Sequence, residues 1–169
     1  MKTLLLLLIS VSLSAQSYDG LYRQKVKTLD STIETLYAVI SGDKGEKRDW
    51  DLFTYLFADG AQLTPLQTDP HGKVHASYLS PADYVERAGA YLENEGFFEK
   101  EIHRVTETYG NLVQIFSTYE SYRSSKDTKP FARGINSIQL MKDRGRWYVA
   151  NITWQGETDE FPIPDKYLK

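Results

Sequence analysis

The sequence contains no cysteine, three histidines and no strongly basic segment, and each shortage excludes a class of function. Without cysteine among its 169 residues, the chain can form no disulfide, thiolate nucleophile or zinc–cysteine site. A proline and a glycine flank His71 and prevent it from sharing a helical face with His75, and His103 stands alone in an expected strand, so no metal site is predicted. The formal net charge of −3 argues against nucleic acid or an anionic membrane as a partner.

Sequence motifs for cofactors are also missing. The chain has no glycine-rich phosphate-binding loop, no Gly-x-Ser-x-Gly nucleophile elbow and no cluster of histidine and cysteine. We therefore expect no bound cofactor.

The N-terminal segment is typical of a secretory signal peptide. Lys2 precedes an almost uninterrupted apolar run from Leu4 to Leu13, and small residues follow up to Ala15. This run of about a dozen residues is shorter than the roughly 20 that span a bilayer core, and it has no polar face that would suit a buried helix. We expect residues 1–15 to be removed and the chain to be exported, periplasmic or secreted, with no membrane attachment afterwards.

The first half of the remaining chain predicts three helices. Apolar residues recur at helical spacing from Leu29 to Ile40. A shorter aromatic helix is expected from Asp49 to the Asp59-Gly60 pair. Ser80-Pro81 begins a third helix that ends near Glu93, with serine as its cap and proline in its first turn.

The connections between these helices differ in character. The charged segment from Gly42 to Arg48 is expected to be a solvated loop, because it contains nothing to bury. Ala61 to Leu66 predicts a short strand, and the long connection after it is expected to hold a small hairpin around His71-Gly72.

The second half changes to the two-residue period of β-strands. Four segments rich in aromatic and β-branched residues, separated by turn signals, predict successive antiparallel strands joined as hairpins. They are Phe97 to Tyr109, Leu112 to Arg123, Arg133 to Met141 and Trp147 to Trp154. Strands this long favour a bulge or a strong twist. Residues 158–169, which contain two prolines, are expected to form a tail that packs across the surface.

Helix, helix, short strand, helix and a four-strand meander is an α+β order. After an N-terminal arm of residues 16–27, the chain resembles the nuclear-transport-factor-2-like, or SnoaL-like, superfamily over residues 28–157, in particular a bacterial branch of unassigned activity. The segments that carry the resemblance are Gly110 to Glu120, Arg133 to Leu140 and Gly145 to Val149. It implies a cone-shaped fold, in which three N-terminal helices pack on a strongly curved antiparallel sheet with an open mouth, and a homodimer through the sheet.

The resemblance also implies a cavity under the helices. It would place the alternate residues from Val113 to Tyr119, and those from Trp147 to Thr153, on the concave face. The polar residues expected to bind a ligand there are Tyr37, Tyr55, Ser117, Tyr119, Asn136 and Asn151. Apolar walls with a few polar groups are what a small-molecule pocket requires. The alternative is a filled core in which these polar groups satisfy one another.

Three charged residues are expected within the sheet or at its rim: Glu120, Arg133 and Glu157. A glutamate–arginine pair there could orient a substrate carboxylate, or could set the pKa of a carboxylate base. The alternative is a structural salt bridge between neighbouring strands.

The favoured function is therefore binding of a small apolar or aromatic molecule in the cone. The alternatives are an isomerase- or dehydratase-type enzyme acting in the same cavity, and a non-catalytic dimeric scaffold. Isomerase chemistry needs a carboxylate base opposite a tyrosine and a second acid. No aspartate lies within the expected strands outside their turns, which counts against the enzyme.

Overall fold

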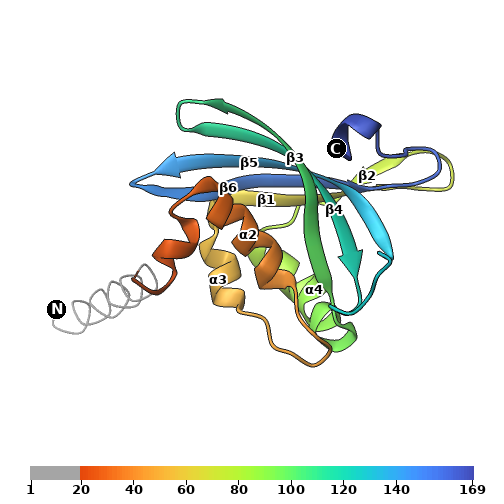
Figure 1. The fold of residues 1–169 in the computed structure, drawn as a ribbon, viewed down its shortest axis with the longest axis horizontal. Helices are drawn as coiled ribbons and strands as arrows, with labels where there is room; N and C mark the ends of the chain where they lie inside the picture. The colour runs from red at the N-terminus through yellow and green to blue at the C-terminus, as the bar shows by residue number, and fades with distance from the viewer. Residues whose placement is uncertain (1–19) are drawn as a thin grey trace, which may run out of the picture.

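The computed structural model describes residues 20–169, so the expected signal peptide of residues 1–15 and the start of the expected arm lie outside the described residues. A short 3₁₀-helix, η1 (Arg23–Val26), leads into three α-helices: α2 (Leu29–Ile40), α3 (Trp50–Tyr55) and α4 (Pro81–Glu95). All three pack on the same side of the sheet (Figure 1). No helix in residues 20–169 has both the length and the apolarity needed to cross a membrane.

Side-chain bonds to the backbone determine where the helices begin. The Thr28 hydroxyl accepts the Ser31 N–H, and the Ser31 hydroxyl accepts the Thr28 N–H, which together form a capping box at the start of α2. Ser80 and Asp83 form the same arrangement at α4, where Pro81 occupies the first position. The predicted Ser80-Pro81 helix start is therefore confirmed.

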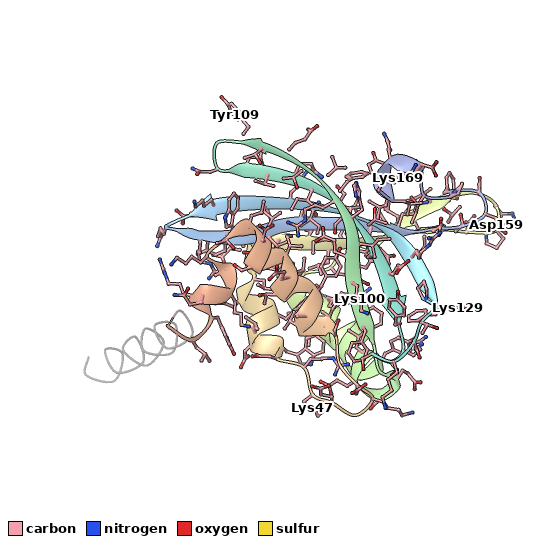
Figure 2. All side chains as sticks on the ribbon, in the orientation of Figure 1. Lys47, Lys100, Tyr109, Lys129, Asp159 and Lys169 are labelled. Carbon is pink, nitrogen blue, oxygen red and sulfur yellow. The ribbon has the colours of Figure 1, made fainter. Side chains whose placement is uncertain are left out.

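Six strands form one sheet in the order β2-β1-β6-β5-β4-β3. They are β1 (Phe57–Thr68), β2 (Val74–Ala76), β3 (Phe98–Tyr109), β4 (Leu112–Tyr122), β5 (Ala132–Asp143) and β6 (Arg146–Gly156). β3 to β6 form the predicted antiparallel meander, and β1 joins it by pairing parallel to β6. The sheet curves around the helices without closing, and Tyr109 projects from the tip of the β3–β4 hairpin (Figures 1 and 2). The predicted α+β cone is confirmed.

β1 begins earlier than the sequence indicated. α3 ends at Tyr55, and β1 starts at Phe57 because Phe57 pairs with Val149 of β6. The expected helix end at Asp59-Gly60 is therefore wrong, since local periodicity carries no signal of pairing with a distant strand. The hairpin expected around His71-Gly72 is confirmed by the pairing of β1 with β2.

The charged segment between α2 and α3 is organised by a buried arginine. Arg48 is only 7% exposed, and its guanidinium donates hydrogen bonds to four backbone carbonyls, those of Ile40, Gly42, Glu46 and Leu92. Two of these carbonyls lie near the C-terminal ends of α2 and α4, where helices lack internal donors. The expectation that this segment has nothing to bury is wrong for Arg48, whereas the neighbouring Lys47 side chain reaches solvent (Figure 2).

Two bulges decide which residues face the helices. Ile102 of β3 has no Cα partner in β4, and Ala150 of β6 has none in β5. One extra residue reverses the alternation of faces along a strand. Beyond each bulge, residues that strict alternation would direct outward therefore point toward the helices.

The C-terminal tail crosses the face of the sheet opposite the helices. It ends in a second 3₁₀-helix, η2 (Asp165–Tyr167). The Tyr167 ring packs on Phe116 with 5.5 Å between ring centroids, and the Tyr167 carbonyl accepts the Thr118 hydroxyl at 2.7 Å. Part of the outer sheet face is thus covered by the chain's own tail.

Candidate functional site

A cavity of about 350 Å³ lies between the helices and the concave face of the sheet. Polar side chains from five elements line it, among them Tyr37 from α2, Tyr84 from α4, Glu99 from β3, Tyr119 from β4 and Asn136 from β5. Most of the remaining wall is apolar and includes Leu36, Ile40, Phe53, Leu63, Leu92 and Ile152. The interior is therefore not completely filled, and its composition is that of a small-molecule pocket.

Glu99 faces this cavity because of the bulge at Ile102. If pairing were regular from the turn at Gly110-Asn111 onward, Lys100 would lie opposite Ser121 and Glu99 would point outward. With Ile102 as an extra residue, Glu99 becomes the partner of Ser121 and shares its inward face. Because of the bulge, the Glu99 carboxyl group faces the inside of the cone in place of the Lys100 amine.

Glu99 is weakly compensated for a charge in the interior. The Ser121 hydroxyl donates to one carboxyl oxygen at 3.2 Å and the Asn136 amide donates to the other at 3.4 Å, both long for bonds to a carboxylate. Within residues 20–169 no lysine, arginine or histidine forms an ion pair with it. Burial raises the pKa of Glu99 to about 7, and the two hydrogen bonds offset only part of that rise. Glu99 can therefore either accept or donate a proton near neutral pH.

Tyr84 and Tyr119 bring two hydroxyl groups to the same cavity. In the described part of the chain neither hydroxyl has a hydrogen-bond partner, although both side chains line the cavity. Burial raises the pKa of both, and the nearby Glu99 raises it further, so both are neutral donors at neutral pH. Three groups with unused hydrogen-bonding capacity therefore converge on one apolar space.

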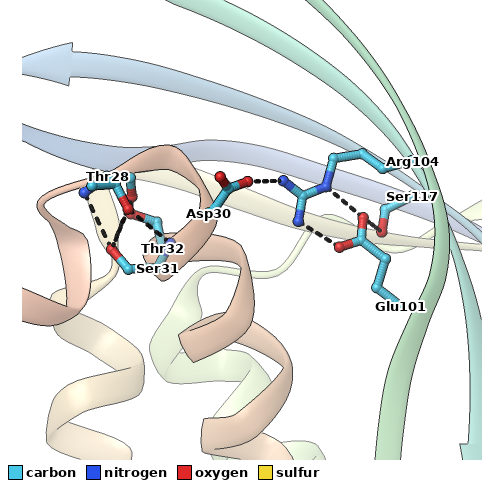
Figure 3. Close-up of polar contacts among 7 residues, drawn as sticks. All are labelled: Thr28, Asp30, Ser31, Thr32, Glu101, Arg104 and Ser117. Carbon is cyan, nitrogen blue, oxygen red and sulfur yellow. Dashed lines mark hydrogen bonds and ion pairs between the residues drawn. The ribbon is translucent and has the colours of Figure 1, made fainter.

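A chain of short hydrogen bonds runs from the cavity toward the surface. The hydroxyls of Tyr37 and Ser117 lie 2.6 Å apart, and Ser117 donates to Glu101 at 2.8 Å. The Arg104 guanidinium donates hydrogen bonds to both carboxyl oxygens of Glu101, at 2.7 and 2.5 Å, and to the carboxyl group of Asp30 at 2.7 Å (Figure 3). Both members of this bidentate ion pair belong to β3, and Arg104 connects the pair to Asp30 at the start of α2.

Asn136 joins this chain to Glu99. Its amide nitrogen donates to the Tyr37 hydroxyl at 3.0 Å and to Glu99 at 3.4 Å. Burial raises the pKa of Tyr37, and the charge of Glu99 adds to that rise. The neutral tyrosine and the amide therefore connect a well-compensated carboxylate, Glu101, to a poorly compensated one.

Comparisons with known proteins identify the fold. No family model and no curated protein matches the sequence. Among solved structures, the β subunit of a candidate aromatic-ring-hydroxylating dioxygenase from Novosphingobium aromaticivorans superposes with a TM-score of 0.58 at 15% identity, covering 85% of this chain and 99% of that one. A protein of unknown function with a cystatin-like fold from Nostoc punctiforme gives 0.58 at 11% identity, covering 78% and 90%.

A nuclear-transport-factor-2-like protein of unknown function from Silicibacter pomeroyi gives a TM-score of 0.50 at 13% identity, covering 76% of this chain and 92% of that one. The chain has a nuclear-transport-factor-2-like fold. At these identities the likeness shows the fold alone. The function of this chain has to be argued from its own cavity.

Three of the six predicted ligand-binding residues line the cavity, and a fourth lies behind its wall. Tyr37, Tyr119 and Asn136 line it, and Ser117 lies directly behind Tyr37. Gln139, on the same strand as Asn136, lies on the opposite face of the sheet.

Asn151 and Tyr55 do not belong to this cavity. Because Ala150 is an extra residue, Asn151 turns to the opposite face of the sheet and lines a groove beside the tail. Tyr55 lies at the end of α3, where its ring stacks on the guanidinium of Arg146 at 3.8 Å. The predicted placement of these two residues in the cavity is wrong.

None of the three predicted rim charges lines the cavity. Glu120 is the cross-strand partner of Arg133, but Arg133 forms its ion pair with Glu157 at 2.8 Å. Glu120 instead accepts the hydroxyl of Tyr122 at 2.6 Å. The Arg133–Glu157 pair thus has the character of a structural salt bridge between strand ends, and orientation of a substrate carboxylate by these residues is not supported.

Sequence reasoning missed Glu99 and the role of Tyr84. The lack of an aspartate in the strands counted against an acid–base site, yet Glu99 supplies the carboxyl group. A glutamate directly after Phe97 and Phe98, at the start of a strand, was the available signal. In residues 20–169 no three histidine, aspartate or glutamate side chains are grouped to hold a metal ion.

Proposed function

We propose that the cavity binds a small, largely apolar or aromatic molecule that carries one hydroxyl or carbonyl group. The observation that supports this is the convergence of Glu99, Tyr84 and Tyr119, which have unused hydrogen-bonding capacity inside apolar walls. Polar groups that border an apolar cavity and have bonding capacity to spare favour a ligand that completes their hydrogen bonds. A volume of about 350 Å³ is at the small end of ligand pockets, which suits a compact ring system.

The charge of the cavity favours a neutral ligand. Glu99 is the only carboxyl group among the lining residues, and no lysine, arginine or histidine is among them. An anionic group deep in the cavity would face a partly ionised carboxyl without a compensating cation. Phenols, cyclic ketones and similar neutral compounds match these groups best.

A second candidate is an enzyme that transfers a proton on the same ligand. Its specific support is the pKa of Glu99, about 7, which suits a general base working at neutral pH. The hydroxyls of Tyr84 and Tyr119 could donate hydrogen bonds to the oxyanion that forms when a proton is removed beside a carbonyl. This is chemistry of the isomerase or dehydratase type.

Ligand binding can be tested by a thermal-shift screen of phenols, cyclic ketones and aromatic acids, followed by calorimetry on the hits. Glu99→Gln and Tyr119→Phe should each weaken binding about tenfold, the effect of one hydrogen bond. Glu120→Gln and Tyr148→Phe, which change the same residue types outside the cavity, should leave binding unchanged. Equal affinities in all four variants would remove the cavity as the binding site.

The enzyme can be tested separately by following exchange of protons next to the carbonyl of bound cyclic ketones in D₂O by NMR. Wild-type protein should accelerate the exchange, and Glu99→Gln should abolish that acceleration. Tight binding without accelerated exchange would favour a pure binding protein.

Export and a homodimer through the outer sheet face stay predictions of the sequence. Fractionation of cells that produce the full chain with a C-terminal tag tests the first. Light scattering of the purified protein tests the second, for which the tail on Phe116 and Thr118 leaves only part of the outer face available.

A further inference from the structure

The hydrogen-bond chain behind the cavity has a determined direction. Glu101 receives two N–H groups from Arg104, so it is a carboxylate that only accepts hydrogen bonds. Ser117 has one hydroxyl proton, which it donates to Glu101. The short bond between Ser117 and Tyr37 can therefore form only with Tyr37 as the donor.

This direction fixes the orientation of the Asn136 amide. Once the Tyr37 proton is committed to Ser117, the Tyr37 oxygen needs a donor, and the amide nitrogen of Asn136 supplies it. The second N–H of the same nitrogen points to Glu99. With its oxygen in that place, the amide would oppose the lone pairs of both Tyr37 and Glu99.

We propose that the Arg104–Glu101 ion pair is a positioning device for the cavity: it sets the direction of the chain, so that Asn136 is held as a donor to Glu99 and the chain gives Glu99 no proton. Arg104, Glu101 and Ser117 are positioning residues, and none of them touches the ligand space. The inference rests on the proposed function, because Glu99 is the cavity residue whose hydrogen bonding the ion pair would control.

The break in the chain at Asn136 has a consequence for proton exchange. A hydroxyl can accept one proton and pass on another, whereas a carboxamide donates hydrogen bonds but does not pass protons along. Glu99 is thereby insulated from Glu101 and from the exposed Asp30 at the surface. It exchanges its proton only on the cavity side, with the ligand or with water there.

Few other side chains near Glu99 can change its charge. The titratable side chains that face it are Tyr37 from α2, Tyr84 from α4 and Tyr119 from β4, and all three are neutral at neutral pH because burial raises their pKa. The only other donor to its carboxyl group in the described part of the chain is Ser121. Burial has the largest effect on the charge of Glu99, and Asn136 and Ser121 are the side chains that modify it.

The decisive experiment measures the pKa of Glu99 by ¹³C NMR titration of its carboxyl carbon in ligand-free protein, with the resonance assigned through Glu99→Gln. The double variant Glu101→Gln/Arg104→Gln keeps the net charge and removes the anchor. Its new amide at position 101 can donate to Ser117, so the chain can reverse and Asn136 can turn its oxygen inward. The pKa of Glu99 should rise by about one pH unit, the effect expected for losing a donor to a buried carboxylate.

Asp30→Asn is the matched control, because it removes the outer partner of Arg104 and leaves the bidentate pair with Glu101 intact. The pKa of Glu99 should not change in this variant. If Asp30→Asn shifted it as much as the double variant, Arg104 would act only by fastening β3 to α2 through Asp30, and the proposal would be overturned.

Ser117→Ala provides a second route if the double variant does not fold. It cuts the chain between the ion pair and Tyr37 without changing any charge, and the pKa of Glu99 should again rise. An unchanged or lowered pKa in folded Ser117→Ala protein would contradict the proposal. Since the titration needs no ligand, its outcome and that of the ligand screen are independent of each other.

Discussion

Arg48 and Glu99 are both charged side chains in the interior, and their surroundings differ. Arg48 donates to four backbone carbonyls, two of them at 2.6 Å. Glu99 receives only two bonds, at 3.2 and 3.4 Å, and borders an open space. All three guanidinium nitrogens of Arg48 donate to the backbone, whereas the carboxyl group of Glu99 retains capacity to interact.

The difference shows that burial of a charge does not by itself indicate function. A buried charge that donates to several backbone carbonyls, such as Arg48, holds chain segments together. A buried charge that is weakly bonded and next to a cavity, such as Glu99, costs stability and marks a functional candidate. The four variants below test this distinction, and their expected effects decrease in order.

Arg48→Met should have the largest effect on stability. It keeps much of the apolar stem and leaves the carbonyls at the ends of α2 and α4 without their donor, so the free energy of unfolding should fall by about 3 kcal/mol. Urea unfolding followed by tryptophan fluorescence measures this. Lys47→Met, at the exposed neighbouring position, should cost under about 1 kcal/mol, and an equal loss in both would deny Arg48 its structural role.

Glu99→Gln should change how stability depends on pH. The pKa of Glu99 rises on folding from its ordinary value of 4.5 to about 7, so the folded protein binds more protons than the unfolded chain between these values. Stability from this group is present below pH 4.5, falls as the pH rises, and is lost above pH 7. The total is up to roughly 3 kcal/mol.

The measurement compares the free energy of unfolding of wild type and Glu99→Gln at pH 4.5 and pH 8. Relative to wild type, the free energy of unfolding of Glu99→Gln should be higher at pH 8 than at pH 4.5, by up to roughly 3 kcal/mol. Glu120→Gln should follow the wild-type pH dependence. If the free energy of unfolding of Glu99→Gln depended on pH in the same way as that of wild type, Glu99 would be better compensated than the structure indicates.

Gly134→Ala should disturb the cavity wall. A Cβ atom at this position would lie 2.4 Å from the Gln155 carbonyl and 2.4 Å from the Tyr119 hydroxyl. We expect a loss of about 2 kcal/mol from overpacking, together with weaker ligand binding because Tyr119 must move. Gly156→Ala, whose Cβ would have 3.9 Å of clearance, should be tolerated, and similar losses in both variants would point to a general effect on the strands.

Arg133→Gln should have the smallest effect. The Arg133–Glu157 ion pair is partly exposed, and pairs of this kind contribute about 0.2–1 kcal/mol. Ligand affinity should not change, because neither residue lines the cavity. A tenfold loss of affinity would restore the prediction that these charges orient a ligand.

The predictable part of the fold depends on local signals. Ser80-Pro81 marks the start of α4 through a capping box and a proline, and Gly110-Asn111 marks the turn between β3 and β4. Apolar spacing locates α2. The start of β1 could not be predicted in this way, because it depends on pairing with β6, far away in the sequence.

The predictable part of the site ends at the bulges. Alternation along β4 correctly places Ser117 and Tyr119 toward the interior, because β4 has no extra residue relative to β5. The same reasoning fails for Asn151 beyond Ala150, and regular pairing across the β3–β4 hairpin would likewise have directed Glu99 outward. A bulge gives little signal in a single sequence, since any residue can occupy the extra position.

Because β3 contains one extra residue, the same segment could direct either of two sets of side chains into the cone. In the present register the segment directs Glu99 and Glu101 inward, and a slide by a single residue would present Lys100 and Ile102 in their place. The register of β3 against β4 therefore decides whether carboxyl groups or an amine face the interior of the cone. Removing Ile102 would make the acidic alignment the regular one, because Glu99 and Glu101 would then face inward without a bulge.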